Sequence, residues 1–96
     1  MLFQWTGCEA ADLQNSYLTY PHSGILGNNL LSGSSYSSAD DCKLACSQNE
    51  GVRDWCRTFE LSAVSSWCNY HAVTPREVPD QWQTTPYYDL YQRTCA

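Results

Sequence analysis

The pattern of hydrophobic and polar positions predicts one short helix near the middle of the chain. Residues 38–49 read Ser-Ala-Asp-Asp-Cys-Lys-Leu-Ala-Cys-Ser-Gln-Asn, and Cys42 and Cys46 stand four residues apart, which places both on one helical face. Ser38 is a favoured N-cap residue, and the two aspartates that follow it suit the positive end of the helix dipole. We therefore predict a helix whose two thiols point into the body of the domain.

Alternation of side-chain types after this helix predicts an antiparallel hairpin. In residues 55–61, large side chains at every second position are set against Cys56, Thr58 and Glu60, which favours a strand packed on one side. Residues 62–66 form the turn, and residues 67–73 form the returning strand. Looser alternation predicts an edge strand at 2–8. Turn residues separate short extended pieces at 12–14, 17–21 and 24–31, and residues 87–95 are expected to form the last strand.

Two segments lack such alternation. The serine-rich residues 32–38 are expected to lead into the helix N-cap. Residues 74–86 contain three prolines, which cannot donate to a sheet ladder, so we expect an irregular surface loop there.

Chain length and cysteine content predict that disulfides stabilise this domain. The 96 residues predict a single domain spanning 1–96, with a core too small to dispense with extra support. Six cysteines spread from end to end are typical of disulfides in a secreted protein. Zinc and redox sites are less favoured, because no Cys-x2-Cys pair is present and the two histidines stand far apart.

The negative net charge of the chain makes several classes of ligand less favourable. The net charge is −5 and the chain has one lysine, which argues against nucleic acid, anionic membranes and sulfated polysaccharides as ligands. No apolar run is long enough to insert into a membrane as a helix. The first residues lack the pattern of a signal peptide, so we expect a mature fragment or a module of a longer secreted polypeptide.

The order and spacing of the cysteines resemble the PAN/apple domain family. The resemblance is carried by Ser-x3-Cys42-x3-Cys46, then Cys56-Arg-Thr-Phe, then Cys68, with an outer cysteine near each end of the chain. It implies an α+β fold in which an antiparallel sheet of about five strands curls around one central helix. It also implies, among the 15 pairings that six cysteines allow, three disulfides: Cys42 with Cys68, Cys46 with Cys56, and Cys8 with Cys95.

Residues that could carry catalysis or bind a metal do not form a recognisable motif. Serines, His22 and His71 could be combined on paper, but no Gly-x-Ser-x-Gly elbow is present. Asp40 and Asp41 lack the spaced acidic series of a calcium loop. We predict no enzymatic activity, no metal and no cofactor, with structural roles for both histidines.

The aromatic residues are the main candidates for recognition. Trp55, Phe59 and Trp67 flank cysteines of the hairpin and are expected in the core. A second group lies in or beside predicted loops, where the rings either cover sheet edges or contact a ligand; its members are Trp82, Tyr87, Tyr88 and Tyr36.

The family resemblance and the acidic charge together indicate an extracellular recognition or adhesion module. The expected ligand is a protein or a neutral glycan. The alternative is a self-associating module, in tandem copies or as a subunit of an extracellular fibre or coat. A small secreted enzyme or inhibitor is the remaining, minor possibility.

Overall fold

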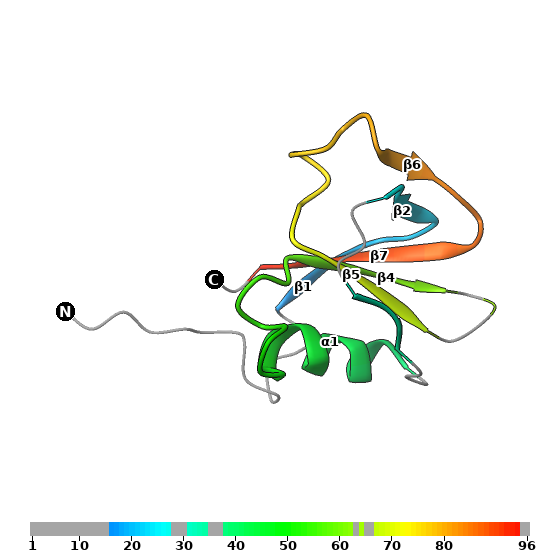
Figure 1. Cartoon of the computed structure of the whole chain (residues 1–96). Coiled ribbons are helices and arrows are strands. Elements are labelled where there is room, and N and C mark those ends of the chain that lie inside the picture. Colours follow the sequence, from blue (N-terminus) through cyan, green and yellow to red (C-terminus); the bar gives the residue numbers. More distant parts are fainter. Residues whose placement is uncertain (1–15, 28–30, 35–37, 63, 65–66, 95–96) are drawn as a thin grey trace.

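The described part of the chain forms one helix and seven strands arranged in three layers. A computed structural model of the chain describes residues 16–27, 31–34, 38–62, 64 and 67–94. A five-stranded antiparallel sheet has the helix on one side and a two-stranded sheet on the other (Figure 1). The elements are β1 (Tyr17–Tyr20), β2 (Ser23–Ile25), β3 (Leu31–Ser34), α1 (Ala39–Gln48), β4 (Thr58–Ser62), β5 (Cys68–His71), β6 (Trp82–Thr84) and β7 (Tyr88–Arg93). The predicted α+β class and the single helix against an antiparallel sheet are confirmed.

The helix begins and ends as its sequence predicts. The Ser38 side chain accepts a hydrogen bond from the N–H of Asp41 at 3.3 Å, which satisfies one of the free donors of the first turn. At the other end, the N–H of Asn49 donates to the carbonyl of Ala45 at 3.2 Å. The face that contains Cys42, Ala45 and Cys46 is buried.

The large sheet is ordered β1-β7-β4-β5-β3, so β4 lies at its centre. The predicted hairpin is present as β4 and β5, and the predicted last strand is present as β7. The expectation that the first hairpin strand packs on one side only is wrong. Thr58, Phe59 and Glu60 are all buried, because α1 covers one face of β4 and β2 lies near the other face.

Two disulfides fasten the helix to the hairpin. Cys42 is bonded to Cys68 on β5, and Cys46 is bonded to Cys56, which precedes β4. Both pairs are those that the family resemblance implies. Cys8 and Cys95 lie outside the described residues.

Two strands lie where the sequence predicted none. The serine-rich segment contributes β3, which pairs with β5 across an irregularity in register between Leu31 and Ser34. The proline-containing segment 74–86 contributes β6, because its three prolines stand on either side of Trp82–Thr84 and leave those residues free to pair with β2. The strand predicted at 2–8 and the extended piece predicted at 12–14 lie outside the described residues.

The hydrophobic core fills the space between the sheet and α1. The ring of Phe59 is stacked on Tyr91 at 4.9 Å between centroids and meets Tyr17 edge-on at 5.6 Å. Phe59 is fully buried, as predicted, and Trp55 is half-buried against this cluster. The prediction for Trp67 is wrong, since its side chain is 41% exposed. Its neighbour Cys68 takes the position that faces the helix, so alternation turns Trp67 away from the core.

Candidate functional site

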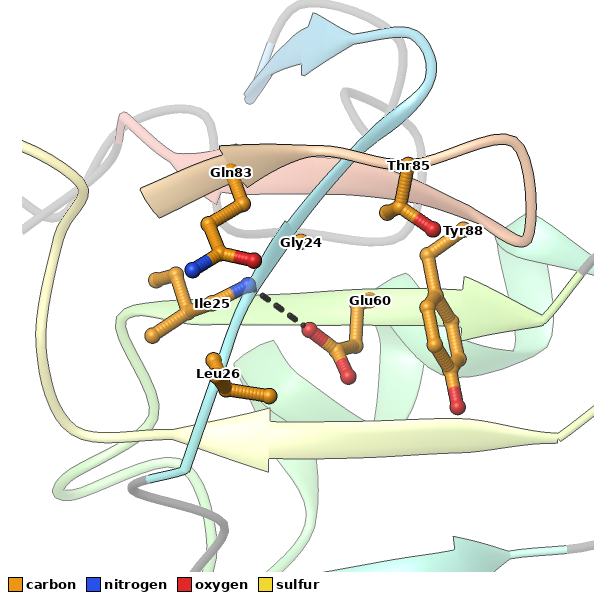
Figure 2. A pocket seen from close by; sticks show the side chains of 7 residues that line it. All are labelled: Gly24, Ile25, Leu26, Glu60, Gln83, Thr85 and Tyr88. Carbon is orange, nitrogen blue, oxygen red and sulfur yellow. Dashed lines mark hydrogen bonds between the residues drawn. The ribbon is translucent and has the colours of Figure 1, made fainter. Parts of the chain in front are cut away.

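A pocket of about 130 Å³ lies where β2 and the end of β6 pass over β4 and β7. β2 and β6 lie on the side of the large sheet opposite α1 (Figure 1). Figure 2 shows the lining of the pocket, which comprises Gly24, Ile25, Leu26, Glu60, Gln83, Thr85 and Tyr88. The pocket is therefore made by residues that are far apart in the sequence.

Gly24 allows the two sheets to approach each other closely. It pairs with Gln83 in the small sheet. A Cβ atom at position 24 would stand 3.1 Å from Oε1 of Glu60 and 3.4 Å from the methyl group of Thr85. A larger residue would thus press on the carboxylate at the base of the pocket.

Among the described residues that line the pocket, Glu60 alone has a carboxylate, and it is 4% exposed. Its Oε1 accepts a hydrogen bond from the N–H of Ile25 at 2.9 Å, and its Oε2 accepts one from Asn69 Nδ2 at 3.0 Å. Asn69 is directly opposite Glu60 in the β4–β5 register. His71 is the diagonal neighbour on the same face, and its Nε2 lies 3.4 Å from Oε1.

These contacts decide the ionisation of Glu60. Burial by itself would raise the pKa of the carboxyl group. The interactions with His71, with Asn69 and with the N–H of Ile25 outweigh burial and lower the pKa below its ordinary value of 4.5. Glu60 is therefore a carboxylate at neutral pH, held by donors from β2 and β5.

The two histidines occupy different environments. His71 is completely buried beside Glu60. His22 lies in the exposed turn between β1 and β2 with a φ of 54°, and its N–H donates to Asp89 Oδ1 at 2.9 Å. They belong to separate parts of the molecule, so no pair of histidines forms a site.

The aromatic residues that the sequence suggested as ligand contacts are only partly brought together. Tyr88 lines the pocket. Tyr87 precedes it, is 61% exposed, and has its N–H bonded to Thr85 Oγ1. Trp82 is 40% exposed but packs edge-on against Tyr20 at 5.3 Å, outside the pocket lining. Tyr36 lies outside the described residues.

Trp82 belongs to a second exposed apolar area. Its partner Tyr20 and the 50% exposed Leu18 are two residues apart on β1, so they share one face of that edge strand. Tyr20 also donates a hydrogen bond to Gln92 Oε1 at 3.2 Å. This area and the pocket are two surfaces of the described residues that contain aromatic side chains.

Polar groups on the helix side of the sheet have a structural role. Burial raises the pKa of Tyr17 to about 12, and its hydroxyl donates to the carbonyl of Lys43 or to Ser47. The ammonium of Lys43 lies 5.8 Å from the Tyr17 ring and 5.4 Å from the Tyr91 ring, which is cation–π distance. These contacts attach β1 and β7 to α1.

Arg93 binds at the C-terminal end of α1. Its Nη1 donates to the carbonyls of Cys46, Arg53 and Cys56 at 3.2, 2.7 and 3.1 Å. α1 has no basic residue in its last turn, so this distant guanidinium supplies the favourable positive charge there. Burial lowers the pKa of Arg93, although the group stays charged under ordinary conditions.

Sequence reasoning missed Glu60, Asn69, His71 and Gly24 as a group. A glycine in an extended segment and a charged residue in a largely hydrophobic strand were the available signals. Neither signal shows that β2 crosses β4, so the pocket could not be recognised before the tertiary fold was known.

Within the described ranges, no cluster of three or more histidine, cysteine, aspartate or glutamate residues is placed to hold a metal ion. In the same part of the chain, no helix has the length and apolar character needed to cross a bilayer. The candidate site is therefore a small pocket with one anionic group, apolar walls and exposed aromatic rings nearby. Such an arrangement can bind a ligand by burial and hydrogen bonding.

Comparison with families of known proteins gives a match over most of the chain. The family model described as PAN domain matches residues 8–95, nearly the whole chain. No curated protein matches the sequence.

Proposed function

The chain belongs to the PAN domain family, and from this premise we propose that it is a non-catalytic recognition module of an extracellular protein. Domains of this family bind proteins or carbohydrates and are generally not catalytic. The acidic net charge of −5 favours a protein or a neutral glycan over a polyanionic ligand. The two disulfides among the described residues suit an extracellular location.

The observation that carries the proposal is the pocket between the two sheets. It is concave, its walls are largely apolar, and it contains a small number of polar groups, as ligand sites usually do. Tyr88 forms part of its wall, and the exposed ring of Tyr87 stands beside it in the chain.

We assign the ligand contacts as follows. Tyr88 packs on the part of the ligand that enters the pocket, and Tyr87 contacts the part that stays outside. Trp82 belongs to the surrounding surface that a larger ligand would cover, and Tyr36 stays a ligand contact suggested by the sequence. Aromatic side chains suit this role because they bury a large area and lose little conformational freedom.

Binding to arrays of neutral glycans and of extracellular protein domains would test the proposal. We expect Tyr88→Ala to weaken binding of any ligand found there about tenfold, since truncating an aromatic contact commonly costs more than 1 kcal/mol. Val64→Ala is the matched control, because Val64 is 78% exposed and lies outside the pocket. Equal binding by the wild type and Tyr88→Ala would refute the assignment of the pocket as the ligand site.

Self-association is a second candidate, and the exposed area of Leu18, Tyr20 and Trp82 favours it. In that case, sedimentation would show a mass that rises with protein concentration, and Trp82→Ala would shift the equilibrium towards monomer. A monomer at all concentrations would leave recognition of another molecule as the function.

A further inference from the structure

The pocket places one buried carboxylate between apolar walls. Figure 2 shows the Glu60 carboxylate lying between Ile25 and Leu26 on one side and the ring of Tyr88 on the other. The remaining polar groups of the lining are few, and the hydroxyl of Thr85 already accepts a hydrogen bond from the N–H of Tyr87.

The charge of Glu60 is not neutralised by a lysine or an arginine of the described chain. Its contacts come from the N–H of Ile25, from the amide of Asn69 and from His71, which is charged only if protonated. The N–H of Ile25 and the amide of Asn69 are neutral donors, which solvate a carboxylate without adding a positive charge. Buried charges in proteins are usually paired with a charge of opposite sign.

We propose that this pocket receives the side chain of a lysine from a protein partner. The ammonium group would lie against Glu60 at the base, and the methylene stem would pack between Leu26 and Tyr88. The ring of Tyr88 would add a cation–π contribution near the ammonium. This inference rests on the proposed function, because it names the ligand of the same recognition site.

The volume of the pocket and its apolar walls favour a lysine side chain over a sugar ring. A cavity of about 150 Å³ accommodates a benzene molecule, so a pocket of about 130 Å³ holds one side chain of comparable volume. A sugar ring carries several hydroxyl groups, and these apolar walls would leave most of them without partners.

Arginine fits less well because of the way Glu60 is held. Each carboxylate oxygen already accepts one hydrogen bond, from Ile25 or from Asn69. The edge of the carboxylate is therefore not open to the paired donors of a guanidinium. An ammonium group acts as a point charge, so it can contact the carboxylate from a single direction without paired donors.

The charge of the whole chain agrees with this ligand. A net charge of −5 attracts a basic surface over a distance of about 10 Å at ordinary salt concentrations. A partner that presents an exposed lysine on a basic surface would thus be drawn to the domain before contact.

Titration of the full chain followed by amide chemical shifts would test the proposal. The probe is Nα-acetyl-lysine methylamide, and the matched ligand is the norleucine analogue, which keeps the stem and lacks the ammonium. We expect the lysine probe to bind with a dissociation constant of about 1–10 mM, as a few buried atoms allow. The shifts should centre on Gly24, Ile25 and Gln83, and the norleucine probe should bind at least tenfold more weakly.

Three variants test whether the negative charge of the pocket contributes to lysine binding. Glu60→Gln should weaken lysine binding at least tenfold, and its fold is checked by its amide spectrum. Gln83 is an exposed residue of the lining, so its variants should fold normally. Gln83→Lys should weaken binding of the lysine probe, and Gln83→Glu should strengthen it.

Different results of these titrations would overturn the lysine assignment alone or the recognition site as well. Equal binding of both probes, shifts away from the pocket, or no response to the charge of residue 83 would overturn the lysine assignment. If a neutral glycan gave those pocket shifts instead, the recognition site would stand and the lysine assignment would fall. Absence of any ligand at the pocket, together with unchanged array binding by Tyr88→Ala, would overturn both.

Discussion

At the scale of single residues, Glu60 connects the layers of the fold. Its carboxylate is held by donors on β2 and β5 while its backbone belongs to β4. One side chain therefore fixes the small sheet over the large one and also gives the pocket its charge. Loss of this carboxylate should affect stability and recognition together.

Glu60 should give the folding stability a specific dependence on pH. Its pKa is lowered in the folded state below the ordinary value of 4.5, so its contribution is present above pH 4.5. The contribution is lost as the pH falls through the folded pKa, which lies below 4.5. We expect Glu60→Gln to cost about 1–3 kcal/mol at pH 7, with this difference from the wild type shrinking below pH 4.5.

Urea denaturation at several pH values from 7 to 2.5 measures this difference. Glu50→Gln is the control, because Glu50 is exposed and should show a small difference at every pH. A difference for Glu60→Gln that stayed constant down to pH 2.5 would contradict the assigned role.

At the scale of elements, the helix is defined by local signals. Ser38 caps the first turn, and the ten-residue α1 is too short to be stable by itself in water. Its stability thus depends on the cap, on the packing of its buried face and on the two disulfides.

Ser38→Ala should lower the free energy of unfolding by about 1 kcal/mol, because the N–H of Asp41 loses its acceptor. Ser38→Asp keeps a capping oxygen and should stay close to the wild type. Equilibrium urea denaturation measures both variants. If alanine and aspartate were equivalent at this position, the cap would not contribute to stability.

The helix, the hairpin and the last strand could be predicted because their signals lie within each segment. The cap at Ser38, the four-residue spacing of Cys42 and Cys46, and the alternation around Phe59 are all local. β3 and β6 were missed for a common reason. Both pair with the backbone of a strand that is distant in the sequence, and neither sequence, Leu-Ser-Gly-Ser or Trp-Gln-Thr, alternates regularly between apolar and polar residues.

The candidate site was harder to predict than the fold. Tyr88 was selected from the sequence, and it does line the pocket. Trp82 was selected for the same reason, yet it packs on Tyr20 instead. Glu60 and Gly24 were overlooked because their importance arises only when β2 crosses the large sheet.

At the scale of the whole molecule, the two disulfides of the described residues lie on the helix side of the large sheet. They close loops with sequence separations of 26 and 10 residues. In the chain-entropy account, a longer closed loop restricts the unfolded chain more strongly. The bond between Cys42 and Cys68 should therefore contribute more than the bond between Cys46 and Cys56.

Replacing both cysteines of one bond by alanine tests this order. We expect each double variant to lose about 2–4 kcal/mol, with the Cys42/Cys68 variant about 1 kcal/mol less stable than the Cys46/Cys56 variant. Urea denaturation under oxidising conditions measures the difference. Excess reductant opens both bonds and should abolish the near-UV circular dichroism of the wild type; retention of that signal would contradict the covalent contribution.

The arrangement of the layers has an evolutionary consequence. These covalent bonds and α1 support one side of the large sheet, whereas β2 and β6, whose residues help to line the pocket, lie on the other (Figure 1). Substitutions at exposed pocket positions such as Leu26 and Gln83 leave the cysteine-bonded side untouched. Selection can therefore diversify ligand preference on one side while it preserves foldability on the other, and a randomised library confined to these positions would retain a high proportion of folded clones.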